Sequence, residues 1–215
     1  MPDALVIDAL TFRYRREQPA VIEGLSYSCR AGTRLGVWGP NGSGKTTLLN
    51  LVAGLLHPER GTITLDGRPT EAQRRRIAMI AADFDLFEYL SVEENVRFVL
   101  DFYEVKWTPD EFRGYVDGYA LNDFLHQSAV ATSRGIRRKT QIVAALLMHP
   151  RMLVADEPLD GLDEAAQRRW FTDTAEFAHA GGIAMFSLHD RGLMHEFTDG
   201  VLSLDAAPAP AGRDG

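Results

Sequence analysis

A glycine-rich segment carries the clearest chemical signal in this sequence. Residues 39–46 read Gly-Pro-Asn-Gly-Ser-Gly-Lys-Thr and fit the pattern G-x-x-x-x-G-K-[ST]. Glycine lets a backbone curl so that successive N–H groups point into one hollow, which suits phosphate oxygens. In a loop of this kind the lysine reaches the β- and γ-phosphates of a nucleotide, and the next hydroxyl binds Mg²⁺. The residues expected to hold the phosphates and the metal are Gly39, Pro40, Asn41, Gly42, Ser43, Gly44, Lys45 and Thr46.

Two adjacent carboxylates give a second chemical signal. Asp156 and Glu157 follow an apolar run at residues 152–155. An acid at the end of a buried strand is well placed to hold the water shell of a metal ion, and its neighbour can orient or deprotonate an attacking water. We therefore predict Asp156 as a metal ligand and Glu157 as a catalytic residue. The alternative is a charge pair at the start of a helix.

The elements that position these residues follow from hydrophobic spacing. Residues 34–38 predict a buried strand before the loop, and residues 45–56 predict a helix with a periodic apolar face after it. Three alternating runs near the N-terminus, at residues 4–7, 10–14 and 21–29, predict an antiparallel β patch. The runs at 62–65 and 77–81 are expected to pair across a turn. These strands are expected at residues 4–7, 10–14, 21–29, 62–65, 77–81, 152–155, 183–188 and 201–204.

The middle of the chain is predicted to be helical. Ser91 with Glu94, and Thr108 with Glu111, have the form of capping boxes, and both mark helix starts. Strands and helices alternate again after this region, so the pattern describes an α/β core with a helical insert of about 60 residues. Helices are expected at residues 92–105, 109–120, 134–148 and 163–180.

Composition limits the function classes. With 215 residues, 45% of them hydrophobic, the chain can build one large domain with an insert. Lys and Arg number 23 against 30 Asp and Glu, and this net charge of −7 argues against nucleic acid as a partner. The single Cys29 is expected to be buried, and the basic clusters 74–76 and 137–139 are expected to face solvent. No membrane-spanning run or secretory signal is visible, which predicts a cytoplasmic location.

With these motifs in place, the chain resembles an ATP-binding subunit of the ABC transporter family over residues 4–205. Residues 39–47 match the family's Walker A motif, adding Thr47 to the ATP-binding residues, and residues 154–158 resemble Walker B. The resemblance implies a P-loop NTPase core, a mixed sheet flanked by helices, with an N-terminal antiparallel β subdomain and an inserted α-helical subdomain. It implies one domain at 1–205, in which 1–82 and 150–205 form the core and 83–149 the helical subdomain. The tail 206–215 is expected to be disordered.

The resemblance implies further site residues. Residues 161–163, Gly-Leu-Asp, resemble the D-loop and end at Asp163. His189 resembles the switch histidine that contacts the γ-phosphate, and Tyr14 resembles the aromatic residue that stacks on adenine. Residues 132–136, Thr-Ser-Arg-Gly-Ile, stand where the family has its signature LSGGQ. Ser133 and Gly135 match that motif and are expected to bind the γ-phosphate. Lys45 and His189 are expected to act with Glu157 in catalysis.

The chain departs from the family pattern at the Q-loop. The family has glutamine after the strand at 77–81, and this chain has Ala82 there. Asp83 is predicted to replace the glutamine as a metal ligand. The alternatives are a slower ATPase that lacks this contact, or a different organisation of the coupling to the membrane partner.

The function implied by the resemblance is ATP hydrolysis coupled to transport. The chain is expected to bind ATP and Mg²⁺, to dimerise with a second copy or a homologous ATPase subunit, and to power a separate transmembrane permease subunit. That permease would hold it on the inner face of the cell membrane, and the variant motifs favour an exporter. The alternatives are a non-transport ABC ATPase, a P-loop nucleoside kinase, and a low-activity subunit paired with an active partner.

Overall fold

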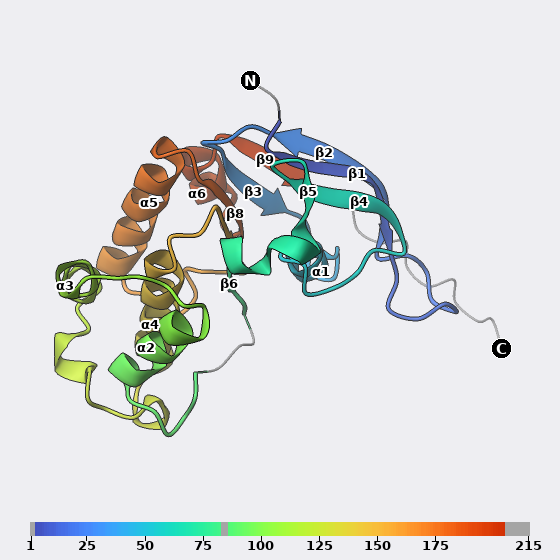
Figure 1. Ribbon diagram of the computed structural model, residues 1–215. Helices are drawn as coiled ribbons and strands as arrows, with labels where there is room; N and C mark the ends of the chain where they lie inside the picture. The colour runs from blue at the N-terminus through green and yellow to red at the C-terminus, as the bar shows by residue number, and fades with distance from the viewer. Residues whose placement is uncertain (1–2, 83–85, 205–215) are drawn as a thin grey trace.

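The computed structural model describes residues 3–82 and 86–204 and has the predicted α/β architecture (Figure 1). A parallel sheet lies at its centre, an antiparallel sheet lies beside it, and helices α2, α3 and α4 form a lobe on the side away from the antiparallel sheet. The predicted tail 206–215 lies outside the described residues. Among the described residues, no helix has the length and apolar character needed to span a membrane.

The central sheet has five strands, and every pair that the structure describes in it is parallel rather than mixed. Helices and the second sheet cover both faces, so its strands are apolar runs with little alternation. The four residues of β7, for example, are all buried. The strand order is β6 (Ile77–Ile80), β7 (Met152–Ala155), β8 (Ile183–Ser187), β3 (Arg34–Trp38) and β9 (Gly200–Ser203).

The second sheet is antiparallel, as predicted at the front of the chain. The two strands expected at 4–7 and 10–14 are one strand whose register shifts between Ile7 and Leu10, where Ala9 has a φ of 45°. This bulge produced the break in the hydrophobic pattern. The strand order is β2 (Ile22–Cys29), β1 (Leu5–Phe12), β4 (Arg60–Leu65) and β5 (Arg68–Pro69).

The expected pairing of strands 62–65 and 77–81 is wrong. β4 pairs with β1 and β5, whereas β6 pairs with β7 in the parallel sheet. Between them lies a 3₁₀ segment, Thr70–Arg76, that carries the chain from one sheet to the other. Alternation within a run predicts a strand but contains no information about its partner, so the sequence could not separate these two strands.

Besides helix α4 of the lobe, which contacts β6, three helices pack against the parallel sheet: α1 (Lys45–Val52), α5 (Glu164–His179) and α6 (Arg191–Phe197). α1 ends earlier than expected because the chain turns at Gly54, which has a φ of 71° and lies against the backbone of Glu71. α6 was not predicted from the sequence. Its seven residues are too few for a clear helical period, although Asp190 caps its N-terminus through a bond from the Leu193 N–H.

Two helices of the lobe begin at the two predicted capping boxes. In both, the first hydroxyl accepts a hydrogen bond from the amide of the glutamate three residues later, and that glutamate accepts one in return. Short 3₁₀ segments at Asn122–Phe124 and Ala129–Ala131 link the helices. The lobe consists of α2 (Val92–Phe102), α3 (Pro109–Gly118) and α4 (Arg134–Leu147).

Two apolar cores lie on opposite faces of the parallel sheet. Along β7, Leu153 and Ala155 pack into the core shared with the helical lobe and α5, while Met152 and Val154 pack into the core shared with the antiparallel sheet and α1. Successive strand residues point to opposite faces, which explains this division. Both the lobe and the antiparallel sheet are therefore anchored directly on the strands that lead to Asp156.

Candidate functional site

The glycine loop lies between β3 and α1, as predicted. Gly42 and Gly44 have φ values of 80° and 96°, which only glycine adopts readily. α1 has no side-chain cap and no acidic residue in its first turn. The positive end of the helix dipole and its unbonded N–H groups therefore face the loop, an arrangement that favours an anion.

Close packing around the loop also leaves no room for a side chain at Gly39. A Cβ atom on Gly39 would lie 2.4 Å from Ser43 Oγ and 2.6 Å from the carbonyl oxygen of Leu204. Ser43 is 2% exposed, and its Oγ has no hydrogen-bond partner among the described residues. A buried hydroxyl without a partner costs free energy, and a bound phosphate oxygen would relieve that cost.

Lys45 spans the loop from the first residue of α1. Its Nζ donates to the carbonyl oxygens of Gly39 at 2.9 Å and Pro40 at 3.2 Å. The side chain is nearly buried, so the ammonium is held in one place rather than sampling solvent. A fixed positive charge at this point can bind phosphate as soon as the two carbonyl contacts are exchanged.

Asp156 is the centre of a buried hydrogen-bond network. Thr46 Oγ1 donates to Asp156 Oδ2 at 2.5 Å, and Ser187 Oγ donates to Asp156 Oδ1 at 2.6 Å. Ser187 Oγ accepts from the Glu157 N–H at 2.9 Å, and Asp156 is 1% exposed. The network joins the ends of β7 and β8 to the first turn of α1. No role for Ser187 was predicted from the sequence; its hydroxyl near the end of the strand predicted at residues 183–188 was the available signal.

Glu157 and His189 lie together beside this network. His189 Nε2 is 2.7 Å from Glu157 Oε1, and both side chains are partly exposed. Glu157 has a φ of 50°, in the left-handed region that non-glycine residues seldom occupy. Backbone of this kind recurs at active sites, although turns such as the one at Asp66 contain it as well.

A hollow of about 540 Å³, here named the central hollow, brings most of the predicted site residues together. Tyr14, a residue that is 57% exposed, lies at its edge and is held by a 2.9 Å hydrogen bond between its hydroxyl and Thr47 Oγ1. The volume falls within the range of small-molecule sites. The lining residues are Tyr14, Val21, Asn41, Gly42, Gly44, Lys45, Thr46, Thr47, Glu157 and His189.

Ser133, Gly135 and Asp163 are not among the described residues that line the central hollow. Ser133 caps α4 by accepting from the Ile136 N–H at 3.3 Å. A Cβ on Gly135 would lie 2.4 Å from the carbonyl oxygen of Gly161, so the backbone of the first turn of α4 touches the segment around Gly161. The structure therefore places these three residues in a second cluster of their own.

Asp163 belongs to this cluster through α4 and α5. It caps α5 by accepting from the Ala166 N–H at 2.9 Å, and its Oδ2 lies 2.5 Å from Lys139 Nζ. The hydrogen bond from Lys139 is the main reason that the pKa of Asp163 lies below its ordinary value. Asp163 thus fixes the D-loop against α4.

The expectation that residues 137–139 form a solvated face is wrong. Arg138 is 4% exposed, and Lys139 is also buried. Arg138 donates to the carbonyl oxygen of Ala81 at 2.9 Å, and its burial lowers its pKa. Consecutive helix residues point in different directions, so a run of three charges cannot share one solvated face. The cluster 74–76 is exposed, as expected.

The Q-loop position is alanine at the end of β6. Ala82 is described and carries no donor or acceptor on its side chain. Asp83, the predicted metal ligand, lies outside the described residues. The buried Arg138 holds the carbonyl next to this position and thereby links the lobe to the edge of the parallel sheet.

Comparisons with known proteins agree with this geometry. The sequence profile of the family described as ABC transporter matches residues 22–160. The phosphonates import ATP-binding protein PhnC 2 of Synechococcus is 32% identical, over 93% of this chain and 81% of that protein. The cytochrome c biogenesis ATP-binding export protein CcmA of Cupriavidus necator is 29% identical, over 87% of this chain and 84% of that protein. The molybdenum import ATP-binding protein ModC of Mesorhizobium japonicum is 38% identical over 63% of this chain. The matched part spans only 39% of the length of ModC.

Solved structures show the same fold. The structure of an ATP-binding subunit of an ABC transporter superposes with a TM-score of 0.86 at 26% identity, covering 95% of this chain and 87% of that one. A putative ABC transporter ATP-binding protein from Pyrococcus furiosus gives a TM-score of 0.81 at 26% identity, covering 93% of this chain and 96% of that one. The family match and the long fold alignment exclude the nucleoside kinase alternative. This chain belongs to the ABC transporter family and is one of its ATP-binding ATPase domains.

Proposed function

We propose that this chain hydrolyses ATP as one half of a dimer and that the dimer drives a membrane permease. One observation carries the catalytic part. The network of Thr46, Asp156 and Ser187 presents Glu157 and His189 to the same hollow that holds the Lys45 ammonium. Phosphate-binding and water-activating groups therefore face one another across a space of nucleotide size.

The residues of the glycine loop, of the Asp156 network and of the central hollow fit ATP and Mg²⁺. The loop amides, the orphaned Ser43 hydroxyl and Lys45 are donors for phosphate oxygens. Thr46 and Asp156 bring a hydroxyl and a carboxylate into contact at the loop, which is a hard-oxygen donor pair of the kind that Mg²⁺ prefers. When bound, Mg²⁺ neutralises charge on the β- and γ-phosphates. The exposed Tyr14 ring is assigned to the adenine, on which it can stack.

Hydrolysis follows from the positions of the chain's own groups. Glu157 accepts a hydrogen bond from the attacking water and orients it towards the γ-phosphorus. Lys45 stabilises the negative charge that develops on the phosphoryl oxygens. His189, 2.7 Å from Glu157, orients that carboxylate and donates to the γ-phosphate when the site is filled.

The second cluster supports the dimer. Ser133 and Gly135 are the matching residues of the signature, yet they do not line the hollow of their own chain. We assign them to the γ-phosphate of an ATP bound to a second copy or a homologous subunit, with Asp163 holding the D-loop beside them. Residues 1–82 and 150–205 would then act as the core, and residues 83–149 as the lobe that carries the signature.

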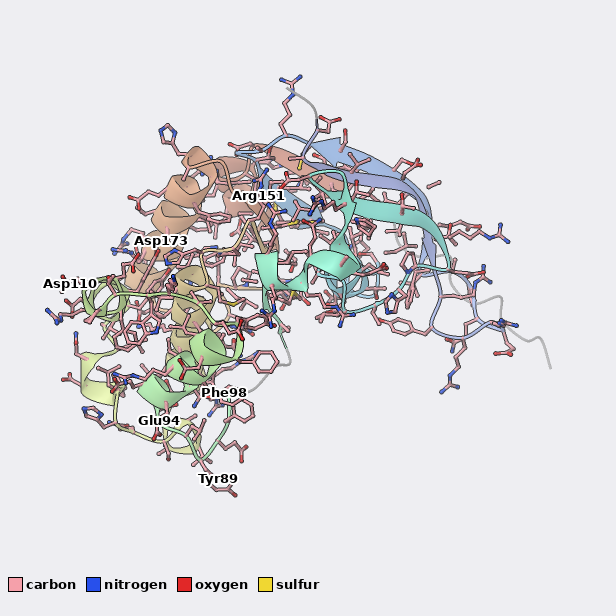
Figure 2. All side chains as sticks on the ribbon, viewed as in Figure 1. Tyr89, Glu94, Phe98, Asp110, Arg151 and Asp173 are labelled. Atoms are coloured by element: carbon pink, nitrogen blue, oxygen red, sulfur yellow. The ribbon has the colours of Figure 1, made fainter. Side chains whose placement is uncertain are left out.

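Exposed aromatic side chains on the lobe support a membrane partner. Phe87, Tyr89, Phe98 and Phe102 project from the lobe, and Figure 2 shows Tyr89 and Phe98 on its outer side. Apolar surface of this kind marks interaction sites. The assigned partner is a permease subunit, which would place the chain on the inner face of the cell membrane. We infer export as the direction because the signature is variant; the long-matching relatives include both an import protein and an export protein and do not decide the direction.

Ala82 favours a second function, that of a low-activity ATPase paired with an active homologue. The methyl group at this position can neither bind Mg²⁺ nor orient water. If this function is correct, the purified chain alone will show ATP binding with little turnover, and a homologous subunit will restore it.

The Glu157→Gln substitution tests the main proposal. The amide cannot accept a proton but fills the same space, so ATP binding should persist while turnover falls by at least about 10²-fold. The dimer should then accumulate when ATP is added. Sedimentation measures the dimer, and phosphate release measures turnover. Glu164→Gln, an exposed residue on α5, is the matched control and should hydrolyse normally. Full turnover in Glu157→Gln, or a monomer at saturating ATP, contradicts the proposal.

A further inference from the structure

Arg134 occupies a signature position where the family motif has glycine, and its side chain makes an ion pair with Asp160, the residue just before the D-loop. Its guanidinium contacts the Asp160 carboxylate, with the two side chains 63% and 39% exposed. Arg134 is the first residue of α4, between Ser133 and Gly135. Asp160 lies three residues after Glu157. The ion pair therefore joins the first turn of α4 to the same segment that it touches at Gly135 and Gly161.

The surroundings of Arg134 are unfavourable for a cation except at Asp160. The first turn of α4 has no acidic residue, and the positive end of a helix dipole disfavours a positive charge. The positive charge of Arg134 also repels that of buried Arg138, whereas the negative charge of Asp160 attracts it. Asp160, the anion that compensates this crowding, comes from another element and is partly open to solvent.

We propose that Arg134 contacts the γ-phosphate of ATP bound to the partner subunit, and that Asp160 holds the Arg134 guanidinium until the two subunits close. This inference rests on the dimer of the proposed function, in which Ser133 and Gly135 reach the same phosphate. The third signature residue then adds a charged contact that a glycine at this position cannot make. Arg134 acts as a charge-stabilising residue supplied in trans.

The chemistry of the exchange supports this assignment. A guanidinium binds carboxylate and phosphate with the same planar set of N–H donors, so the γ-phosphate can replace Asp160 as the anion at Arg134. An exposed ion pair is weak because water and salt screen it, so little opposes the exchange. ADP lacks the γ-phosphate and offers no such replacement.

The test uses opposite effects of the two partners on ATP-dependent dimerisation. In the Glu157→Gln background, Arg134→Ala should weaken the dimer at least about tenfold, because a trans contact to phosphate is lost. Asp160→Asn should strengthen it about 2- to 5-fold, because Arg134 no longer has to leave a carboxylate. The dimer dissociation constant of Arg134→Lys should lie between those of Arg134→Ala and the parent. Dimer dissociation constants at saturating ATP are measured by sedimentation.

The matched control is Arg168→Ala. Arg168 makes an exposed ion pair with Glu164 on α5, and its loss should leave the dimer constant unchanged. Thermal unfolding of each monomer in ADP confirms that the variants fold. A merely structural ion pair would make Arg134→Ala and Asp160→Asn weaken the dimer together, and that result overturns the inference, as does an unchanged constant for Arg134→Ala. If the Glu157→Gln parent itself does not dimerise with ATP, the proposed function fails first and the inference falls with it.

Discussion

At the scale of single residues, Ser187 organises the catalytic edge although it carries no charge. Its Oγ donates to Asp156 and accepts from the Glu157 backbone, so one hydroxyl fixes both carboxylate residues. The side chain is fully buried, and no solvent can replace these bonds. The positions of the metal-binding and water-orienting groups therefore depend on the last residue of a neighbouring strand.

Ser187→Ala should affect both stability and activity. The substitution leaves Asp156 Oδ1 and the Glu157 N–H without a partner in a buried site, which costs about 1–3 kcal/mol of unfolding free energy. The ATPase rate should fall about tenfold or more, because a misplaced catalytic group is costly. Urea unfolding and phosphate release measure the two effects. Ser203→Ala on the exposed end of β9 should change neither, and normal turnover in Ser187→Ala would show that the network is not needed.

At the scale of elements, local signals were predictable and long-range placement was not. The glycine loop and the capping boxes at Ser91 and Thr108 depend on a few adjacent residues, and the structure confirms them. The pairing of β6 with β7 joins segments more than 70 residues apart, and no local pattern records it. Burial of Arg138 depends on the same packing. The sequence therefore predicts the parts of the candidate site, but not the hydroxyl of Ser187 that joins them.

Asp66 joins the antiparallel sheet to the parallel one and gives a pH-dependent prediction. From the turn after β4, its carboxylate accepts from Arg151 Nε at 3.0 Å and Nη2 at 2.8 Å, and from Arg76 Nη2 at 2.8 Å. Arg76 directly precedes β6, and Arg151, labelled in Figure 2, directly precedes β7. The hydrogen bond from Arg151, followed by that from Arg76, lowers the pKa of Asp66 below its ordinary value.

A lowered carboxyl pKa stabilises the folded state above the pKa of the unfolded chain, and that stability is lost as pH falls through the folded value. Asp66→Asn should cost about 1 kcal/mol at pH 7, and the difference from the parent should disappear in acid, below the folded pKa. Asparagine tolerates the φ of 49° at this turn, so the backbone is kept. Urea unfolding at a series of pH values from 7 downwards measures this difference in unfolding free energy. Asp8→Asn, an exposed strand residue, is the control, and a pH-independent difference would contradict the prediction.

At the scale of the whole molecule, the helical lobe connects the catalytic edge to an exposed aromatic surface formed by Phe87, Tyr89, Phe98 and Phe102. Arg138 binds the carbonyl of Ala81 at the base of the lobe, and Asn95 of α2 holds the segment that carries Phe87 through its side chain and the Phe87 backbone. A force applied at the aromatic surface would therefore reach the end of β6 through packed helices. This continuity offers a route for coupling that does not need a glutamine at Ala82.

The aromatic surface should bind the permease. Phe98 packs between Phe87 at 4.5 Å and Phe102 at 6.4 Å between ring centroids, and Phe102 and Tyr89 are the most exposed. The double variant Tyr89→Ser and Phe102→Ser should fold and bind ATP normally, because neither ring belongs to a core. It should lose copurification with a multi-span membrane protein encoded by a neighbouring reading frame and co-expressed with it. Leu55→Ser removes a similar exposed apolar side chain outside the lobe and should copurify as the parent does. Retention of the membrane protein by the double variant would place the docking site elsewhere.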